Sequence, residues 1–141
     1  MNQTELYSLI FTDTFVANLA FCFTNEIAVG TIKVFNNYNL VLVILLASFA
    51  SILAYAVNYI FGKVVFKILK PFQQEKGQSN TIKFQKLDCN IFFRLLLFLS
   101  AFSIYGKFIV FFIGFANLSF RQMIFITSVA KLTYYFYFLI L

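Results

Sequence analysis

The sequence between residues 40 and 62 reads LVLVILLASFASILAYAVNYIFG and contains no charged residue. A helix of this length reaches about 34 Å at a rise of about 1.5 Å per residue, which is enough to span the hydrocarbon core of a bilayer. Small residues allow helices to approach closely in lipid, so we expect the small face of this helix to contact the rest of the protein. That face consists of Ala47, Ser48, Ala50, Ser51, Ala54 and Ala56.

The composition of the whole chain also indicates that lipid is its solvent. Its 141 residues are 62% hydrophobic, 21% aromatic and 11% charged, whereas a soluble domain is about 45–50% apolar and about 25% charged. So few polar residues do not cover the surface of a small soluble domain, and the high hydrophobicity excludes a disordered chain. We therefore predict an all-α integral membrane protein with a single membrane domain over residues 1–141.

The stretch that precedes the spanning segment is too short to cross a bilayer. Residues 14–25 carry no charge, Glu26 follows, and a second short apolar stretch leads to a turn-rich cluster. Because a spanning helix needs about 20 residues, these arms predict a re-entrant hairpin over residues 10–39 with Glu26 at its tip. Asp13 would begin this hairpin as a helix cap or would line its pocket.

The second half of the chain repeats this outline. Residues 95–120 contain two uncharged arms around Lys107, and residues 122–141 form a second spanning segment that is interrupted only by Lys131. A hairpin followed by a spanning helix, repeated once, predicts two units of inverted topology whose hairpin tips meet near the midplane around a polar pocket. Arg121 would mark the inner end of the last helix or serve as a ligand.

Residues 63–94 carry most of the positive charge. The net charge is +6, and seven of the 11 Lys and Arg residues lie in this segment, together with the single proline, Pro71. The positive-inside rule predicts a cytoplasmic linker, and the alternative is a cluster that binds acidic lipid headgroups. Since the charge is confined to one loop, a nucleic-acid-binding groove is not expected.

Three charged residues fall inside the predicted hydrocarbon region. A charge there costs about 2.5–3.5 kcal/mol on insertion scales, so Glu26, Lys107 and Lys131 need partners or water. Glu26 and Lys107 would neutralise each other or face a pocket that binds an ion, a proton or an anionic headgroup; alternatively, both lie at the interface and snorkel to water. Lys131 would face the bundle, unless the true span is shifted.

The sequence lacks the residues that several catalytic and metal-binding functions require. The chain contains no histidine, which removes the imidazole base, the imidazole haem ligand and the ordinary zinc site. With no nucleophile elbow and no phosphate-binding glycine loop, neither an enzyme nor a cofactor or metal site is expected. Cys22 and Cys89 are expected to be free buried thiols rather than a disulfide. The aromatic residues 134–138 are expected to anchor the last helix at the membrane interface.

Several short motifs recur in the order and spacing of a known membrane family. Small residues precede Asn-Tyr and then Gly-Lys, Thr24-Asn25-Glu26 closes the first hairpin arm, and two further glycine motifs lie in the second hairpin. This pattern resembles the DedA superfamily, also called the SNARE-associated or VTT domain, and is most similar to its YqaA-like branch. The resemblance covers roughly residues 10 to 140. The matching motif positions are Asn58, Tyr59, Gly62, Lys63, Gly106 and Gly114.

The chain departs from the family pattern in ways that bear on the site. Alanines replace the glycines before Asn-Tyr, the prolines expected near Glu26 and after Gly106 are absent, Lys63 replaces an arginine, and Lys107 replaces an acid. The resemblance implies a small bacterial inner-membrane protein of membrane homeostasis that translocates a lipid carrier such as undecaprenyl phosphate, with proton or sodium coupling. A cation at Lys107 reverses the charge on which such coupling relies.

The sequence thus favours a transporter or translocase of a lipid-phosphate carrier or an ion, with Glu26, Lys107 and Lys131 in its pocket. The two lysines suit a phosphate headgroup. The alternative is a non-transporting structural or assembly subunit of a membrane complex; a holin-like pore is a third reading, but it needs plain spanning helices rather than half-length hairpins. Membrane lipids are the expected partners, and the small-residue surface is compatible with a homodimer.

Overall fold

The structure, a computed structural model, is helical throughout its regular elements. These elements are α1 (Gln3–Ala17), α2 (Ile27–Thr31), α3 (Leu40–Gln74), α5 (Gly106–Phe115) and α6 (Phe120–Ile140). The residues that the structure describes are 3–22, 24–32, 38–74, 95, 97–98, 105–115 and 119–140. The all-α class predicted from the sequence is confirmed for these residues.

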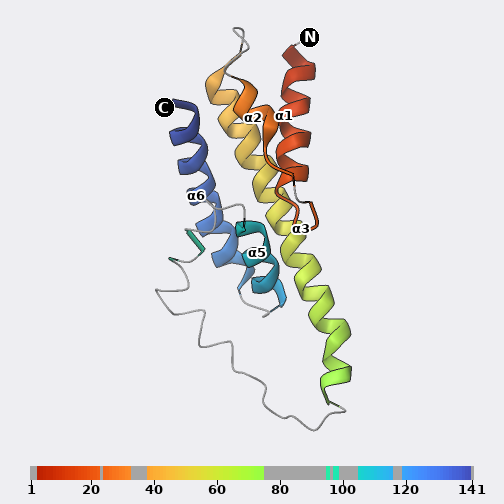
Figure 1. Cartoon of the computed structure of the whole chain (residues 1–141). Helices are drawn as coiled ribbons and strands as arrows, with labels where there is room; N and C mark the ends of the chain where they lie inside the picture. Colours follow the sequence, from red (N-terminus) through yellow and green to blue (C-terminus); the bar gives the residue numbers. More distant parts are fainter. Residues whose placement is uncertain are drawn as a thin grey trace.

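The other helices pack along α3, which runs the length of the molecule (Figure 1). α1, α5 and α6 each contact it. Within the described ranges, Leu40–Leu69 is the one helix that is both long and apolar enough to cross a membrane, and Gly106–Phe115 is a shorter apolar helix. α6 has 21 residues, the length expected of a second span, but it is not among the helices that meet both conditions.

α3 continues beyond its predicted end at Gly62, and that predicted boundary is wrong. The helix extends to Gln74 because Lys63 and Lys67 lie one turn apart and apolar residues continue between and after them, so that these charges do not interrupt the apolar side. Pro71 removes a hydrogen bond from the helical ladder, and α3 ends three residues after it. The rest of the predicted linker, residues 75–94, lies outside the described residues.

The first hairpin begins earlier than predicted, and its first arm is shorter. α1 starts at Gln3 rather than near residue 10, and it ends at Ala17. The predicted arm over 14–25 is wrong because the helix ends before Asn18, whose backbone amide and side-chain Nδ2 both donate to the Thr14 carbonyl oxygen, at 3.2 and 2.8 Å. α1 buries one face against its neighbours, formed by Leu6, Ile10, Thr14 and Ala17.

α2 is a short helix that returns beside α1, and its start is held by a carboxylate. Glu26 is its N-cap residue but makes no capping hydrogen bond with its side chain. Instead, Oδ2 of Asp13 accepts a hydrogen bond from the Ala28 amide at 2.8 Å, which satisfies one of the amides that a helix start leaves free. Asp13 is therefore a helix cap, as one of its two predicted roles required, but it caps α2 rather than beginning α1.

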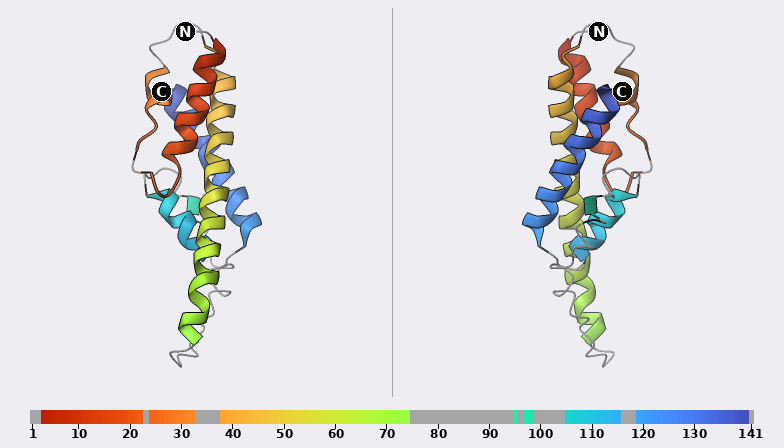
Figure 2. Two further views of the ribbon diagram at one scale, coloured as in Figure 1. Left: turned by 90° about the vertical axis from the view of Figure 1, so that its right-hand side faces the viewer. Right: turned by 90° about the vertical axis from the view of Figure 1, so that its left-hand side faces the viewer.

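In the second half of the chain, α5 runs in the same direction as α3 and α6 returns (Figures 1 and 2). α6 therefore ends at the end of the molecule where α1 begins, while the last turns of α3 project beyond α5 and α6 (Figure 2). Lys107 is the second residue of α5. Of the arm predicted before it, Leu95, Leu97 and Phe98 are helical, and residues 99–104 lie outside the described part.

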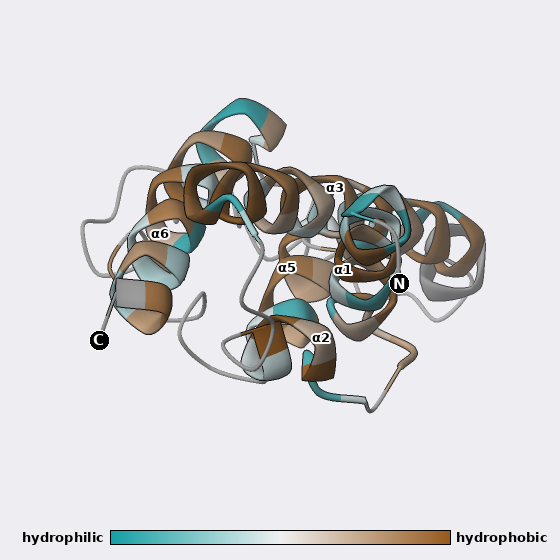
Figure 3. Ribbon diagram, turned by 90° about the horizontal axis from the view of Figure 1, so that it is seen from above, coloured by the Kyte–Doolittle hydropathy of each residue, from teal (hydrophilic) through white to brown (hydrophobic). Residues whose placement is uncertain are grey.

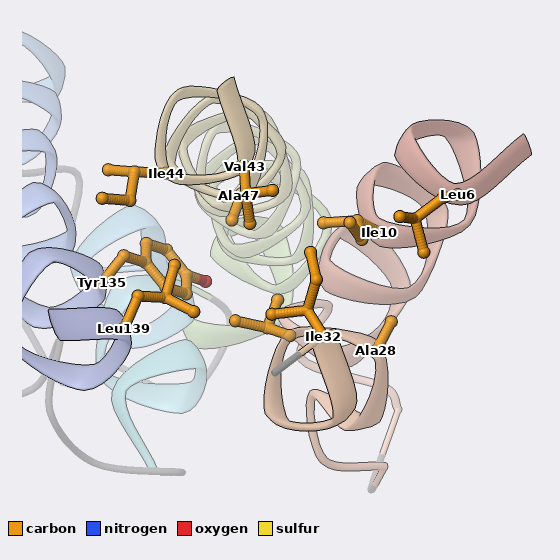
Figure 4. Packing of buried hydrophobic residues seen from close by; sticks show 10 residues of the cluster. Leu6, Ile10, Ala28, Ile32, Val43, Ile44, Ala47, Tyr135 and Leu139 are labelled. Carbon is orange, nitrogen blue, oxygen red and sulfur yellow. The ribbon is translucent and has the colours of Figure 1, made fainter. Parts of the chain in front are cut away.

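Two apolar clusters fill the interior, and α3 contributes to both. The first joins α1, α2, the start of α3 and the end of α6 (Figure 4). The second joins the middle of α3 to Leu97, α5 and the start of α6. On α3 the first cluster ends at Ala47 and the second begins at Tyr55, so the buried Ser51 lies between them. Of the small face predicted from the sequence, five residues are buried, as expected: Ala47, Ser48, Ala50, Ser51 and Ala54.

The outward faces of the helices are apolar as well. Seen along the length of the molecule, hydrophobic residues make up most of the helical ribbon (Figure 3). Large hydrophobic side chains are exposed on every long helix, among them Val16, Phe49, Ile60, Phe112, Phe125 and Phe136. Soluble monomers rarely expose apolar patches of this extent, so a lipid environment matches this surface.

α3 and α5 cross at two glycines, each of which faces the backbone of the other helix. A Cβ atom added to Gly62 would lie 2.1 Å from the Phe111 carbonyl oxygen, and one added to Gly114 would lie 2.1 Å from the Tyr59 carbonyl oxygen. Backbone atoms cannot move aside as a flexible side chain can, so the helices approach this closely only because both positions lack a side chain.

Replacing Gly62 with alanine is expected to push α5 away from α3. We expect Gly62→Ala to lower the free energy of unfolding by about 1–3 kcal/mol, the usual cost of overpacking. The matched control is Gly30→Ala in α2, where an added Cβ meets no atom within 4 Å and the higher helix propensity of alanine is mildly stabilising. Thermal unfolding of both variants in detergent checks this, and equal melting temperatures would contradict the close crossing.

Candidate functional site

Glu26 and Lys131 form an ion pair inside the protein. Nζ of Lys131, in the middle of α6, lies 3.4 Å from Oε1 of Glu26, and the two side chains are 5% and 17% exposed. Lys131 thus faces the bundle, as predicted, and the alternative of a shifted span that leaves it at the surface is not what the structure shows. Of the three charges predicted to share a pocket, these two are brought together.

The carboxylate of Glu26 is held by helices that lie far apart in the sequence. Its Oε1 accepts hydrogen bonds from Asn18 Nδ2 at 2.6 Å and from the Tyr135 hydroxyl at 2.9 Å. Ser51 Oγ lies 2.6 Å from the Tyr135 hydroxyl and accepts a hydrogen bond from Asn18 Nδ2 at 3.3 Å. We call Asn18, Glu26, Ser51, Lys131 and Tyr135 the polar layer. It joins the end of α1, the start of α2, α3 and α6 through hydrogen bonds to charged and neutral partners.

Three tyrosine rings surround the ammonium group of Lys131. Its Nζ lies 5.6 Å from the ring centroid of Tyr55, 5.2 Å from that of Tyr134 and 5.4 Å from that of Tyr135. A cation within about 6 Å of an aromatic face is attracted by the negative face of the ring. The ion pair is therefore flanked by cation–π contacts from both α3 and α6, which offset part of the cost of burying the lysine.

The turn between α1 and α2 is held by hydrogen bonds to an amide side chain of α3. Asn58 on α3 is fully buried, and its Nδ2 donates to the Asn18 carbonyl oxygen at 2.9 Å while its Oδ1 accepts from the Ala20 amide at 2.8 Å. Each buried backbone group that lacks a partner is costly, so these two bonds allow the chain to leave the helix here. Asn58 was predicted only as a motif position, and the structure gives it this role.

Lys107 does not pair with Glu26, so that predicted ion pair is not found. The Lys107 side chain is buried, and its Nζ donates to the Ala17 carbonyl oxygen at 2.9 Å and to the Cys22 carbonyl oxygen. A cation is favoured at the C-terminal end of a helix, where carbonyl groups concentrate negative charge. Because Lys107 is the second residue of α5, its contacts bring the start of α5 onto the turn between α1 and α2.

The remaining predicted positions support packing rather than the ion pair. Tyr59 is buried, and its ring lies 5.0 Å from that of Phe120, centroid to centroid. Gly62 and Gly114 form the helix crossing, and Gly106 is buried at the start of α5. Arg121 is exposed and Lys63 is half-buried. Cys22 is a free thiol, and Cys89 lies outside the described residues.

Five residues around the ion pair were not predicted as site residues from the sequence: Asn18, Tyr55, Tyr134 and Tyr135, which contact Glu26 or Lys131, and Ser51, which contacts Asn18 and Tyr135. Two of these, Ser51 and Tyr55, recur with Asn58 at intervals of four and three residues, which marks one polar face on an otherwise apolar helix. Tyr135 was expected to anchor α6 at the membrane interface; that expectation is wrong for this residue, which is fully buried. Its neighbours along the chain are aromatic, so no local signal separated it from them.

Two further hydroxyls lie one helical turn from the polar layer. Thr14 precedes Asn18 by four residues, and Ser48 precedes Ser51 by three. Both oxygens are buried without a hydrogen-bond partner among the described residues, an arrangement that natural proteins usually avoid.

A metal site is not found among the residues that the structure describes, because they contain no group of three or more His, Cys, Asp or Glu side chains that could hold a metal ion.

Over the part of the chain that the structure describes, the fold and the site define a helical protein with one long apolar helix and an internal ion pair. No family model matches the sequence, and no solved structure matches it. The chain is similar to the uncharacterized protein RP436 of Rickettsia prowazekii (strain Madrid E), with 34% identity over 138 residues that cover 96% of this chain and 95% of the relative. The chain belongs to the family of that bacterial protein, which it matches over almost its whole length.

Removing either charge of the ion pair leaves the other buried without a counter-charge. We expect Lys131→Met to lower the free energy of unfolding by about 3–5 kcal/mol, because the Glu26 carboxylate then has no counter-charge. Adding Glu26→Gln removes the orphaned charge and keeps an oxygen for Asn18 and Tyr135, so the double variant should recover more than half of the loss. Unfolding in detergent of Lys131→Met, Glu26→Gln and the double variant measures these changes.

The control for this cycle is Lys63→Met, which removes a half-buried lysine outside the polar layer. Its stability should change by no more than about 0.5 kcal/mol, as is usual for positions without a special role. Equal losses in Lys131→Met and in the double variant would mean that the two charges do not interact.

Proposed function

We propose that the protein is a membrane-embedded transporter or translocase of the DedA type, acting on a lipid-phosphate carrier or an ion, with the ion pair of Glu26 and Lys131 as its site. The observation that carries the proposal is a buried ion pair beside the middle of the apolar part of α3. Ser51, a member of the same polar layer, lies about 17 Å along α3 from Leu40. This distance is close to half the thickness of a hydrocarbon core of about 30 Å. Ionisable groups at such depth usually serve function rather than stability.

We propose further that the chain consists of two units of inverted topology. Support comes from the turn between α1 and α2, which lies at the polar layer, and from α5, which packs against that turn through Lys107 while α6 runs in the opposite direction to α5 (Figure 2). Irregular backbone is tolerated at membrane depth where protein surrounds it, and Asn58 and Lys107 surround the turn after α1. By the positive-inside rule, the basic residues of 63–94 lie in the cytoplasm of a bacterial cell.

In this proposal an anionic headgroup competes with Glu26 for Lys131. Lysine binds phosphate as a point charge, and Lys131 already lies in the polar layer, paired with Glu26. Lys107 lies on the adjoining turn, where release from its two carbonyl partners would supply a second positive charge. The site then alternates between an internal ion pair and a pair with the substrate, so that no charge stays buried alone.

Transport in reconstituted vesicles tests the proposal. A fluorescent polyprenyl phosphate is placed in the outer leaflet, and a membrane-impermeant quencher reports how much has reached the inner leaflet. We expect the wild-type protein to accelerate this movement, and Glu26→Gln and Lys131→Leu to slow it by at least about tenfold, the effect of roughly 1.4 kcal/mol on a barrier. The control is Phe125→Leu, which changes an exposed apolar side chain of α6.

Unchanged transport in both Lys131→Leu and Lys107→Gln would overturn the assignment of the site. The topology is tested separately by single cysteines at the two hairpin tips, Thr24→Cys and Tyr105→Cys, in a chain whose own cysteines are replaced. Labelling of the two tips from opposite sides of the membrane is the expected result. Labelling from one side would replace the transporter with the alternative, a non-transporting structural or assembly subunit.

A further inference from the structure

Lys131 occupies a set of contacts that would receive the ammonium group of another molecule. One carboxylate oxygen lies 3.4 Å from its Nζ, and three tyrosine ring centroids lie 5.2–5.6 Å from it. Energetically significant cation–π pairs occur only about once per 70–80 residues, yet three rings converge on this one atom. We call Glu26, Tyr55, Tyr134 and Tyr135 the tyrosine cage.

We propose that the tyrosine cage is a binding site for an alkylammonium or quaternary ammonium group, which Lys131 fills in this conformation and which a ligand cation fills when Lys131 withdraws. The inference rests on the proposed function, because it names a chemical group that the same site takes. In the proposed function the substrate offers a phosphate that pairs with Lys131, and this inference adds that the ligand also carries a cationic group that pairs with Glu26.

The geometry favours recognition by charge and ring faces over recognition by hydrogen bonds. The distance of 3.4 Å between Nζ and Oε1 is longer than the 2.7–2.9 Å of a strong charge-assisted hydrogen bond. The same oxygen already accepts shorter bonds from Asn18 and Tyr135. A cation without any N–H group therefore loses little in this cage, and aromatic cages of this kind are how proteins recognise quaternary ammonium ions.

Most of the cage is held in place by contacts that do not involve Lys131. Tyr135 is fixed through its hydroxyl by Ser51 and Glu26, and Tyr55 is fully buried in the second apolar cluster. Tyr134 and Glu26 are only half-buried, so they form the side from which a ligand enters. The cage is thus arranged in advance, which lowers the entropic cost of binding.

Exchange of one cation for another keeps the charge balance of the interior. When a ligand ammonium group enters, Glu26 remains neutralised, and the flexible stem of Lys131 carries its charge toward water or toward an anionic group of the ligand. The cost of burying an unpaired carboxylate is avoided throughout. Lys131 acts as a tethered competitor, so that it sets the affinity for the incoming cation.

Chemical rescue of Lys131→Ala tests the site. The substitution removes Cγ, Cδ, Cε and Nζ, and n-propylammonium carries the same three carbons and nitrogen. We expect the variant to melt at a lower temperature than wild type, and propylammonium chloride to restore more than half of the difference by binding the folded state. Equal concentrations of 1-propanol and of sodium chloride, which supply the shape or the ionic strength alone, should restore none of it.

Two double variants locate the effect. Adding Glu26→Gln or Tyr55→Leu to Lys131→Ala should abolish the rescue, because each removes one part of the cage. A Lys131→Ala protein that folds and is not rescued by propylammonium would overturn the proposal, and so would a rescue that persists in both double variants. Neither result depends on transport, so failure of the cage and failure of the proposed function are distinguishable.

If Lys131→Ala does not fold, the wild-type protein provides the test. Tetramethylammonium that binds the cage displaces Lys131 and leaves that lysine open to modification. Because tetramethylammonium itself does not react with amine-directed reagents, mass spectrometry reads out the modification of Lys131 directly. We expect Lys131 labelling to rise several-fold while Lys63 labelling stays constant. The measurement is then repeated without tetramethylammonium, once in vesicles of choline-headgroup lipids and once in vesicles of anionic lipids alone. A rise in Lys131 labelling only with the choline headgroups identifies a lipid headgroup as the ligand, and a rise only with the added salt identifies a free cation. No rise under any condition would overturn the proposal.

Discussion

A single carboxylate oxygen holds the helices of this protein in register. Oε1 of Glu26 receives Asn18 from the end of α1, Tyr135 from α6 and the ammonium group of Lys131. Because Glu26 lies directly before α2 while its partners belong to the first and last helices, the carboxylate closes the chain upon itself. In an apolar interior such a contact has no competitor in water, so it specifies the arrangement of the helices as well as stabilising it.

The apolar packing is organised around this layer. One cluster lies on the side of the termini and the other on the side of α5, and Ser51 on α3 marks the boundary between them. Close approach of α3 and α5 at Gly62 and Gly114 brings Lys107 against the turn after α1. The crossing of a glycine on α3 with a glycine on α5 therefore helps to position Lys107 of α5 against the turn that leads to Glu26.

The all-helical class, the small buried face of α3 and the inward position of Lys131 were predictable, because each follows from composition or from periodicity within one segment. The pairing of Glu26 with Lys131 rather than Lys107 was not, since both lysines are equally isolated in apolar sequence and only the tertiary packing chooses between them. The end of α1 was missed because a lone Asn18 is a weak stop signal. The end of α3 was missed because lysines were given more weight than Pro71.

The side-chain amide of Asn58 makes the hydrogen bonds that a backbone peptide group would make in a regular helix. This amide carries an NH2 donor and a carbonyl acceptor on neighbouring atoms, and it presents them to the Asn18 carbonyl and the Ala20 amide. Aspartate has the same shape without the donor, and leucine has neither function. In an interior that supplies no water to replace them, the residue at this one position determines whether the polypeptide can leave the helix between α1 and α2.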